Sequence, residues 1–265
     1  MLNGEHEQKE PLTYGSYLRV PELLSLQTQL GPPDARDEML FIVVQQAQEL
    51  WFKQILHELS RVVGLLGGGE LAEAVRLIRR VNQILGVLTD EVIVLETMPP
   101  GEFHKFRHVL VMSSGFESEQ FRELELASGL EDPTFLKVMA KYIDLDAARL
   151  RWKQTLRTAF LGCLEGIDRD PVNALVRIYD EPTRNPELFA LAEVLSEYEV
   201  GFAAWRFHHI KLVQRTIGDH VPGTAGSSGV GYLGKTLTYY FFPELWEARN
   251  RLTAMHTKPP TPVGG

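Results

Sequence analysis

Apolar residues recur at spacings of three and four over three long stretches of the chain. These stretches run from Met39 to Leu59, from Leu71 to Leu95 and from Glu187 to Thr216. Such spacing keeps the apolar side chains on one face of a helix, so each stretch predicts a long amphipathic helix. Strand-like alternation is scarce. Thr236–Phe242 resembles a strand by composition, but we expect it to be irregular or helical. The pattern predicts an all-α fold.

Glycine and proline mark the breaks between the predicted helices. None of the breaks is long enough to be a flexible linker, so we expect a single helical domain over residues 1–265, a bundle of long helices. We expect residues 1–12 and 258–265 to be loose tails. The breaks are Gly31–Pro33, Gly67–Gly69, Pro99–Gly101, Asp132–Pro133, Asp170–Pro171 and Glu181–Pro186.

Composition and charge narrow the class of protein. The chain has 265 residues and a formal net charge of −8, with 44% hydrophobic residues. An acidic chain without a basic block is a poor nucleic-acid binder, because phosphate binding depends on Lys and Arg. No apolar run reaches the roughly 20 residues that cross a bilayer, and the first residues are polar, unlike a signal peptide. Cys163 is the single cysteine, which excludes an internal disulfide. We expect a cytoplasmic protein.

A glycine-rich segment, Pro222–Gly234, separates two ordered regions and is expected to be a loop that approaches a ligand closely. Within it and just beyond, Gly229–Thr236 matches two phosphate-binding motifs, G-x-G-x-x-G and G-x-x-x-x-G-K-T. Both motifs work by starting a helix directly from a buried strand. No apolar strand precedes this one, so we interpret both matches as accidental.

Two pairs of histidines differ in what surrounds them. His104 and His108 are four residues apart, but no third ligand motif accompanies them, so we interpret them as a surface pair. His209 shares a helix face with the aromatic residues of the third long helix, whereas His208 lies on a more polar face. A buried histidine is most often a hydrogen-bonded core residue. A single imidazole on a rigid helix facing an apolar cavity is also the setting of an axial haem ligand.

Two further sets of residues share helix faces. Phe103 and Arg107 are four residues apart, so an aromatic ring and a guanidinium lie on one side of a helix. Spacing by itself favours a surface arginine, although its fork also suits a carboxylate. On the first long helix, Phe41, Gln45, Gln48 and Phe52 form a second stripe. Because buried amides need partners, this stripe faces either water or a pocket with polar spots.

These segments together resemble the tryptophan 2,3-dioxygenase family, all-helical haem enzymes that open the indole ring of tryptophan. The resemblance runs from about Tyr14 to Arg249. Its motifs are YGSYL at 14–18, DEMLFIVVQQAQELWFKQ at 37–54, FHKFR at 103–107, SSGFESEQFRELE at 113–125, RFHHIKLVQRTIG at 206–218, GTAGSSGVGYL at 223–233 and FFPELW at 241–246.

The resemblance implies a role for each matching position. It implies that His209 is the proximal ligand of haem b and that Phe41 and Phe103 are aromatic residues beside the indole. Arg107 matches the arginine that binds the substrate carboxylate, and Thr224 matches the threonine that holds the amino-acid end.

The N-terminal segment and the assembly are also part of the resemblance. Tyr14, Tyr17 and Leu18 match a segment that covers the pocket of a neighbouring subunit. The family forms homotetramers, so we expect a homotetramer here. Dioxygen is the implied co-substrate, and L-tryptophan or a substituted tryptophan is the implied substrate.

The chain departs from the family at two positions. Gln45 stands where the family usually has a distal histidine, and Ala225 replaces a common glycine. An amide oxygen still accepts a hydrogen bond from an indole N–H, but it does not titrate near neutral pH. We therefore expect indole oxygenation, most simply to N-formylkynurenine. The open alternatives are a monooxygenase that gives an oxindole or hydroxylated product, a non-catalytic haem or ligand sensor, and a nucleotide-binding protein that uses Gly229–Thr236.

Overall fold

The computed structural model describes residues 11–110, 117–219 and 230–257, and for residues 230–232 it describes the backbone and no side chain. Every regular element in these ranges is helical, which confirms the predicted all-α class. The elements are α1 (Tyr14–Leu18), α2 (Val20–Leu23), α3 (Glu38–Gly67), α4 (Leu71–Leu95), α5 (Pro100–Phe106), the 3₁₀ helix η1 (Arg107–Leu110), α6 (Glu119–Ser128), α7 (Pro133–Met139), α8 (Leu145–Arg151), α9 (Leu156–Leu164), α10 (Pro171–Asp180), α11 (Pro186–Ile217), α12 (Val230–Thr236) and α13 (Pro243–His256).

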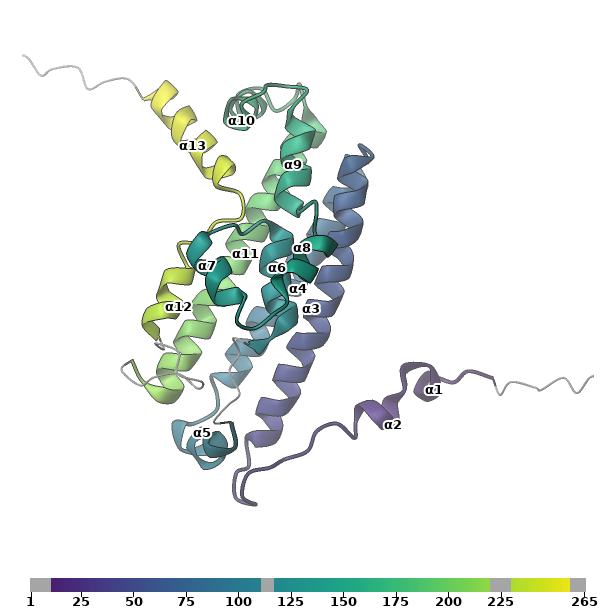
Figure 1. Ribbon diagram of the computed structural model, residues 1–265, viewed down its shortest axis with the longest axis vertical. Helices are drawn as coiled ribbons and strands as arrows, with labels where there is room; N and C mark the ends of the chain where they lie inside the picture. The colour runs from purple at the N-terminus through teal and green to yellow at the C-terminus, as the bar shows by residue number, and fades with distance from the viewer. Residues whose placement is uncertain (1–10, 111–116, 220–229, 258–265) are drawn as a thin grey trace, which may run out of the picture.

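Three long helices, α3, α4 and α11, form the frame of the molecule, and the shorter helices pack around it (Figure 1). α4 packs against both α3 and α11. The three helices occupy the stretches where the hydrophobic period predicts them, and the bounds of α4 agree with the predicted range. Since amphipathic helices of this length bury one face against each other, their packing produces most of the core.

Most of the proline-marked breaks are helix starts. Pro133, Pro171 and Pro186 each lie in the first turn of a helix, where the missing N–H costs nothing. Asp132 and Asp170 precede two of these prolines, and their carboxylates accept hydrogen bonds from backbone N–H groups of the first turn. The Asp-Pro pairs therefore set where α7 and α10 begin.

The start of α3 is held by a buried carboxylate. Glu38 is 4% exposed and accepts hydrogen bonds from the backbone N–H groups of Leu30 and Gly31. A Cβ at Gly31 would lie 2.8 Å from both the Glu38 carboxylate and Phe106. This close approach requires glycine at position 31, and it brings the chain before α3 against α5.

The apolar interior has two parts. The larger one lies among α3, α4, α6, α9, α10, α11 and α13. A smaller cluster of buried residues supports α5 at one end of the frame and consists of Ala35, Val44, Leu95, Met98 and Phe106. That residues 1–265 form a single domain stays a prediction.

The region before α13 is anchored by Glu199. This buried carboxylate accepts hydrogen bonds from the backbone N–H groups of Phe241 and Phe242. The segment after Thr236 is irregular up to the start of α13, as predicted. One prediction is wrong: α12 begins at Val230, inside the stretch expected to be a loop. Its seven residues make a short helix despite two glycines, because tertiary contacts with α11 outweigh low helix propensity.

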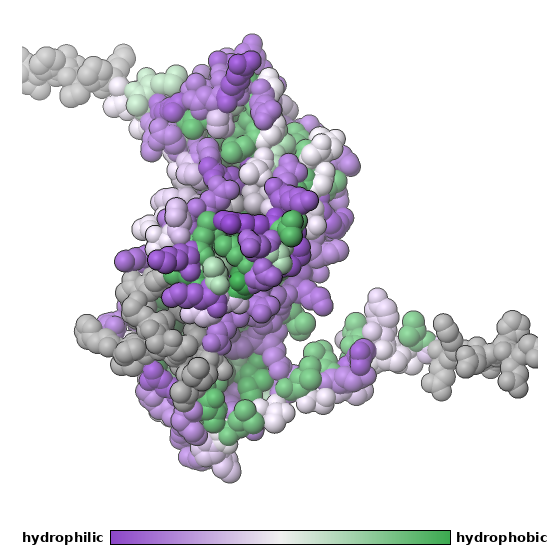
Figure 2. All heavy atoms as spheres, in the orientation of Figure 1, coloured by the Kyte–Doolittle hydropathy of each residue, from purple (hydrophilic) through white to green (hydrophobic). Residues whose placement is uncertain are grey.

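The N-terminal part of the chain forms an arm, Pro11–Leu30, whose helices α1 and α2 lie away from the bundle (Figure 1). The end of the arm nearest α3 is hydrogen-bonded to Gln46 and Glu38 of that helix. Neither helix has a buried residue. Apolar side chains are spread along the arm (Figure 2), and Tyr14 and Tyr17 are 79% and 72% exposed. The predicted tails fall largely on residues 1–10 and 258–265, which lie outside the described residues.

Candidate functional site

A cavity of about 500 Å³ opens between α3, α5, α6, α11 and α12. Its wall is mostly apolar and aromatic, with polar groups concentrated at a few points. It is lined by Phe41, Gln45, Gln48, Glu49, Phe52, Val92, Leu95, Met98, Phe103, Arg107, Leu110, Glu117, Ser118, Phe121, Arg122, Glu125, Trp205, Arg206, His209, Leu212, Val213, Thr216, Ile217, Leu233 and Thr236.

The structure brings five of the candidate residues into this one cavity. Phe41 and Gln45 reach it from α3, Phe103 and Arg107 from α5 and η1, and His209 from α11. These residues come from three distant parts of the sequence. Their meeting is a property of the fold that local spacing could not show.

The other candidates lie elsewhere. Tyr14, Tyr17 and Leu18 do not line the cavity of their own chain, and all three are exposed on the arm. Thr224 and Ala225 lie outside the described residues. His104 and His108 are exposed on α5 and η1 and do not line the cavity.

One end of the cavity is an aromatic corner. The ring of Phe41 lies 6.1 Å from that of Phe103 and 5.5 Å from that of Phe106, and the rings are tilted against one another. Phe106 is fully buried, so it fixes the two rings that reach the cavity. Offset and tilted contacts of this kind are the favourable ones for aromatic pairs. The corner is a preformed surface for a flat apolar ring.

Arg107 stands beside the aromatic corner. It follows the last residue of α5, begins η1 and is half-buried. A guanidinium at the rim of an apolar cavity is a strong carboxylate binder, because two parallel N–H groups match the two carboxylate oxygens.

Gln45 and Gln48 place two amides on the cavity face of α3, one turn apart. Gln48 is 5% exposed, and its Nε2 has no hydrogen-bond partner within the part of the chain that the structure describes. The stripe read from the sequence therefore lines a pocket with polar spots rather than facing water.

α3 is tied to α6 next to these amides. The side-chain amide of Gln120 donates to the backbone carbonyl of Glu49 at 2.9 Å and to its carboxylate at 2.7 Å. Ser118 caps the N-terminus of α6 by accepting from the N–H of Phe121. These contacts fix the position of α6 relative to the cavity face of α3.

His209 lies on α11 and faces the cavity. Its ring stacks on Trp205, with centroids 5.3 Å apart and an angle of 8° between the planes. Burial, assisted by the nearby positive charge of Arg122, lowers the pKa of His209 to about 4. The imidazole is therefore neutral near pH 7, which is the form that ligates metals. Its neighbour His208 points elsewhere, with Nδ1 at 3.4 Å from the Glu96 carboxylate.

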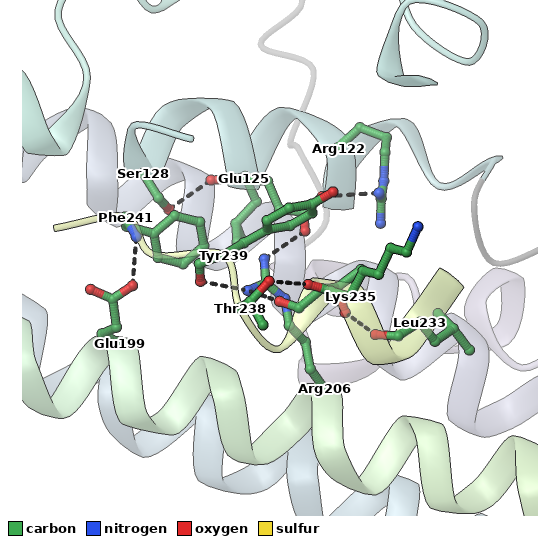
Figure 3. Close-up of polar contacts among 12 residues, drawn as sticks. Arg122, Glu125, Ser128, Glu199, Arg206, Leu233, Lys235, Thr238, Tyr239 and Phe241 are labelled. Carbon is green, nitrogen blue, oxygen red and sulfur yellow. Dashed lines mark hydrogen bonds and ion pairs between the residues drawn. The ribbon is translucent and has the colours of Figure 1, made fainter. Parts of the chain in front are cut away.

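Arg122, Glu125 and Arg206 form a buried charged cluster that lines the cavity, and we call this part of the cavity its deep end. Figure 3 shows the polar contacts of the cluster. Glu125 of α6 lies between two guanidiniums, 3.0 Å from Arg122 and 2.8 Å from Arg206. Arg206, on α11, also donates to the backbone carbonyl of Thr236 at the end of α12. The sequence patterns do not predict this cluster. The signal they offer is an arginine, Arg206, inside the apolar pattern of the third long helix.

The imidazole, the apolar wall and the buried donors of the cavity fit a haem. A neutral imidazole on a rigid helix can serve as an axial ligand, and the largely apolar wall suits a porphyrin. A haem also carries two propionate carboxylates. Several buried donor atoms of the wall, among them Trp205 Nε1 and Gln48 Nε2, have no partner among the described residues, so the cavity offers donors for such acceptors.

The chain is similar to known proteins over most of its length. The family model described as tryptophan 2,3-dioxygenase matches residues 2–160 and 168–252. Proteins named tryptophan 2,3-dioxygenase from Nocardioides sp., Herpetosiphon aurantiacus and Bacillus cereus are 42%, 40% and 38% identical to this chain. The matches cover 93%, 91% and 95% of the chain and 97%, 98% and 97% of the respective relatives.

Proposed function

Because this chain belongs to the tryptophan 2,3-dioxygenase family of haem-dependent enzymes, we propose that it inserts oxygen from dioxygen into the indole ring of L-tryptophan or a substituted tryptophan. The observation that carries the proposal is the meeting of His209, Gln45 and Arg107 in one cavity. When bound, haem supplies the activation of dioxygen. The protein's part is to hold the cofactor through His209 and to orient the substrate.

Substrate orientation comes from the aromatic corner and Arg107. Arg107 binds the amino-acid carboxylate, while Phe41 and Phe103 hold the indole ring. The indole C2–C3 bond then needs closeness and alignment rather than a charged catalyst. Thr224 is proposed to hold the amino-acid end, as the family resemblance implies.

Gln45 determines how the cavity interacts with the indole N–H of the substrate. Its carbonyl oxygen accepts the hydrogen bond of the indole N–H, which contributes about 0.5–1.5 kcal/mol. An amide does not take up that proton near neutral pH, so the substrate nitrogen keeps it throughout. We propose N-formylkynurenine as the product. Since Gln45 removes a titrating group from the cavity, insertion of a single oxygen atom, to an oxindole or hydroxylated product, is the second candidate.

The arm supports a homotetramer in which subunits complete one another's sites. Tyr14 and Tyr17 are exposed on a segment that does not reach the cavity of its own chain. Apolar side chains on the bundle are exposed as well, among them Val43 and Leu50 of α3 and Phe207 of α11. We propose that a second copy of the chain covers both sets of residues.

The cytoplasmic location stays a prediction. Within the described ranges, the helices are too short or too polar to cross a bilayer.

The cofactor assignment is tested by adding hemin to apoprotein and recording the Soret band. We expect the wild type and His208→Ala to give the same ligated spectrum, because His208 faces Glu96 and not the cavity. His209→Ala is expected to lose the band or shift it to that of unligated hemin. An unchanged spectrum in His209→Ala would refute the assignment.

The product is tested with tryptophan, a reductant and ¹⁸O-labelled dioxygen. Two labelled atoms in the product indicate ring cleavage, and one indicates monooxygenation. Tryptophan binding without steady oxygen consumption would favour the haem or ligand sensor and would contradict an enzyme.

A further inference from the structure

We propose that Gln48 is a ligand-binding residue that donates a hydrogen bond from Nε2 to a carboxylate inside the cavity. The proposal rests on the proposed function, because that function supplies the two carboxylate-bearing occupants: haem, through its propionates, and the amino-acid substrate. Of the two, we infer that a haem propionate is the acceptor.

The first observation is an unmet donor. The Gln48 side chain lines the cavity at 5% exposure, and its Nε2 has no protein partner in the ranges that the structure describes. Leaving a buried N–H₂ group without an acceptor costs free energy, and native proteins rarely do so. An occupant of the cavity that carries acceptors would remove this cost.

The second observation is the position of Gln48 along α3. Phe41, seven residues earlier, contacts the aromatic corner, and Phe52, four residues later, contacts the ring of Trp205 at 6.3 Å. Along α3, Gln48 therefore lies between the aromatic corner and Trp205, and it is nearer to Trp205. Arg107, which the proposed function assigns to the substrate carboxylate, stands at the opposite end.

The third observation is the chemistry of the neighbouring wall. Trp205 Nε1 is a second buried donor without a partner among the described residues, and its ring stacks on His209. The nearest carboxylate on α3, that of Glu49, already accepts from Gln120. Unmet donors beside a haem-ligand candidate fit a group that only accepts hydrogen bonds, as an ionised propionate does.

The experiment compares haem loss to excess apomyoglobin from holoprotein made with hemin or with hemin dimethyl ester. The ester removes the propionate charges and keeps the porphyrin. We expect Gln48→Leu to lose hemin about tenfold faster than the wild type, as for one hydrogen bond to a charged group. With the dimethyl ester, whose carbonyl oxygens are weaker acceptors, the variant and the wild type are expected to differ much less in the rate of cofactor loss.

Gln54→Leu is the matched control. Gln54 lies on the same helix, donates to Glu58 and is outside the cavity wall. It should change neither rate. Gln48→Glu keeps the shape of the side chain and replaces the donor with a carboxylate, which repels a propionate. At pH 8 this variant should lose hemin faster than Gln48→Leu. Lowering the pH should reduce the difference between the two variants.

Three outcomes would overturn the propionate as acceptor. Equal acceleration with hemin and with the ester would mean that Gln48 acts through packing, and no acceleration with either would mean that its donor is not used. Unchanged hemin loss with weaker binding of tryptophan, but not of tryptamine, would assign the donor to the substrate carboxylate. A wild type that takes up neither cofactor would instead refute the proposed function.

Discussion

The two ends of the cavity hold guanidinium groups in opposite ways. At the deep end, Arg206 is 5% exposed and bonded to Glu125 and to the backbone of Thr236. At the other end, Arg107 is half-buried and stands on a 3₁₀ turn after a seven-residue helix. A buried charge held by partners from two other helices ties the fold together, whereas the proposed function assigns the half-buried charge of Arg107 to the substrate carboxylate. Both line the same cavity, so position alone does not reveal the role.

The largest effect is expected at the deep end. Glu125→Leu leaves two guanidiniums facing each other without the carboxylate between them. Removing one member of a buried ion pair costs about 3–5 kcal/mol. The free energy of unfolding, measured by urea denaturation, should fall by that amount. Arg107→Leu changes a half-buried position and should lower it less. Equal losses in the two variants would contradict the difference in burial between the two ends.

The next effect is on ligand binding at the rim. Arg107→Leu should weaken tryptophan binding to the holoprotein by about 1.5–3 kcal/mol, the contribution of a hydrogen bond to a charged group. Calorimetry checks this, with the exposed Arg79→Leu of α4 as the control. Tryptamine lacks the carboxylate, so its affinity should be unaffected. A neutral result for tryptophan would mean that its carboxylate binds elsewhere.

The smallest effect concerns pH and the carboxylate that anchors the chain near the deep end. Burial raises the pKa of Glu199 above its ordinary 4.5, although hydrogen bonds from the N–H groups of Phe241 and Phe242 oppose the shift. In the window above pH 4.5 the folded state therefore binds more protons than the unfolded state, and stability falls as pH rises through the folded pKa. Glu199→Gln should flatten this slope in urea titrations across the window. An unchanged slope would remove Glu199 as its source.

Much of the fold could be predicted because helix periodicity is a local signal. α3, α4 and α11 each bury one face, so their apolar residues recur at spacings of three and four in the sequence. For α4 this spacing predicts both bounds to the residue. α12 was missed because its sequence contains two glycines, and contacts with α11 stabilise it. Contacts between distant segments leave no such trace in the spacing of residues.

The site divides in the same way. The stripe that carries Gln45 and Gln48 was visible on one helix, although the sequence left open whether it faced water or a pocket. Glu125 and Arg206 are paired although they lie 81 positions apart in the sequence. The spacing of residues within one helix therefore could not predict this pair. The roles assigned to the candidate residues stay predictions.

The arm has a consequence for how catalysis scales with protein concentration. No residue of α1 or α2 is buried within the part of the chain that the structure describes, so nothing described there holds Tyr14 and Tyr17 over the cavity of their own chain. If a second copy completes each site, dilution separates the parts of the site while every bundle stays folded. Turnover per subunit would then decline on dilution, at protein concentrations where the melting temperature of the bundle is unchanged.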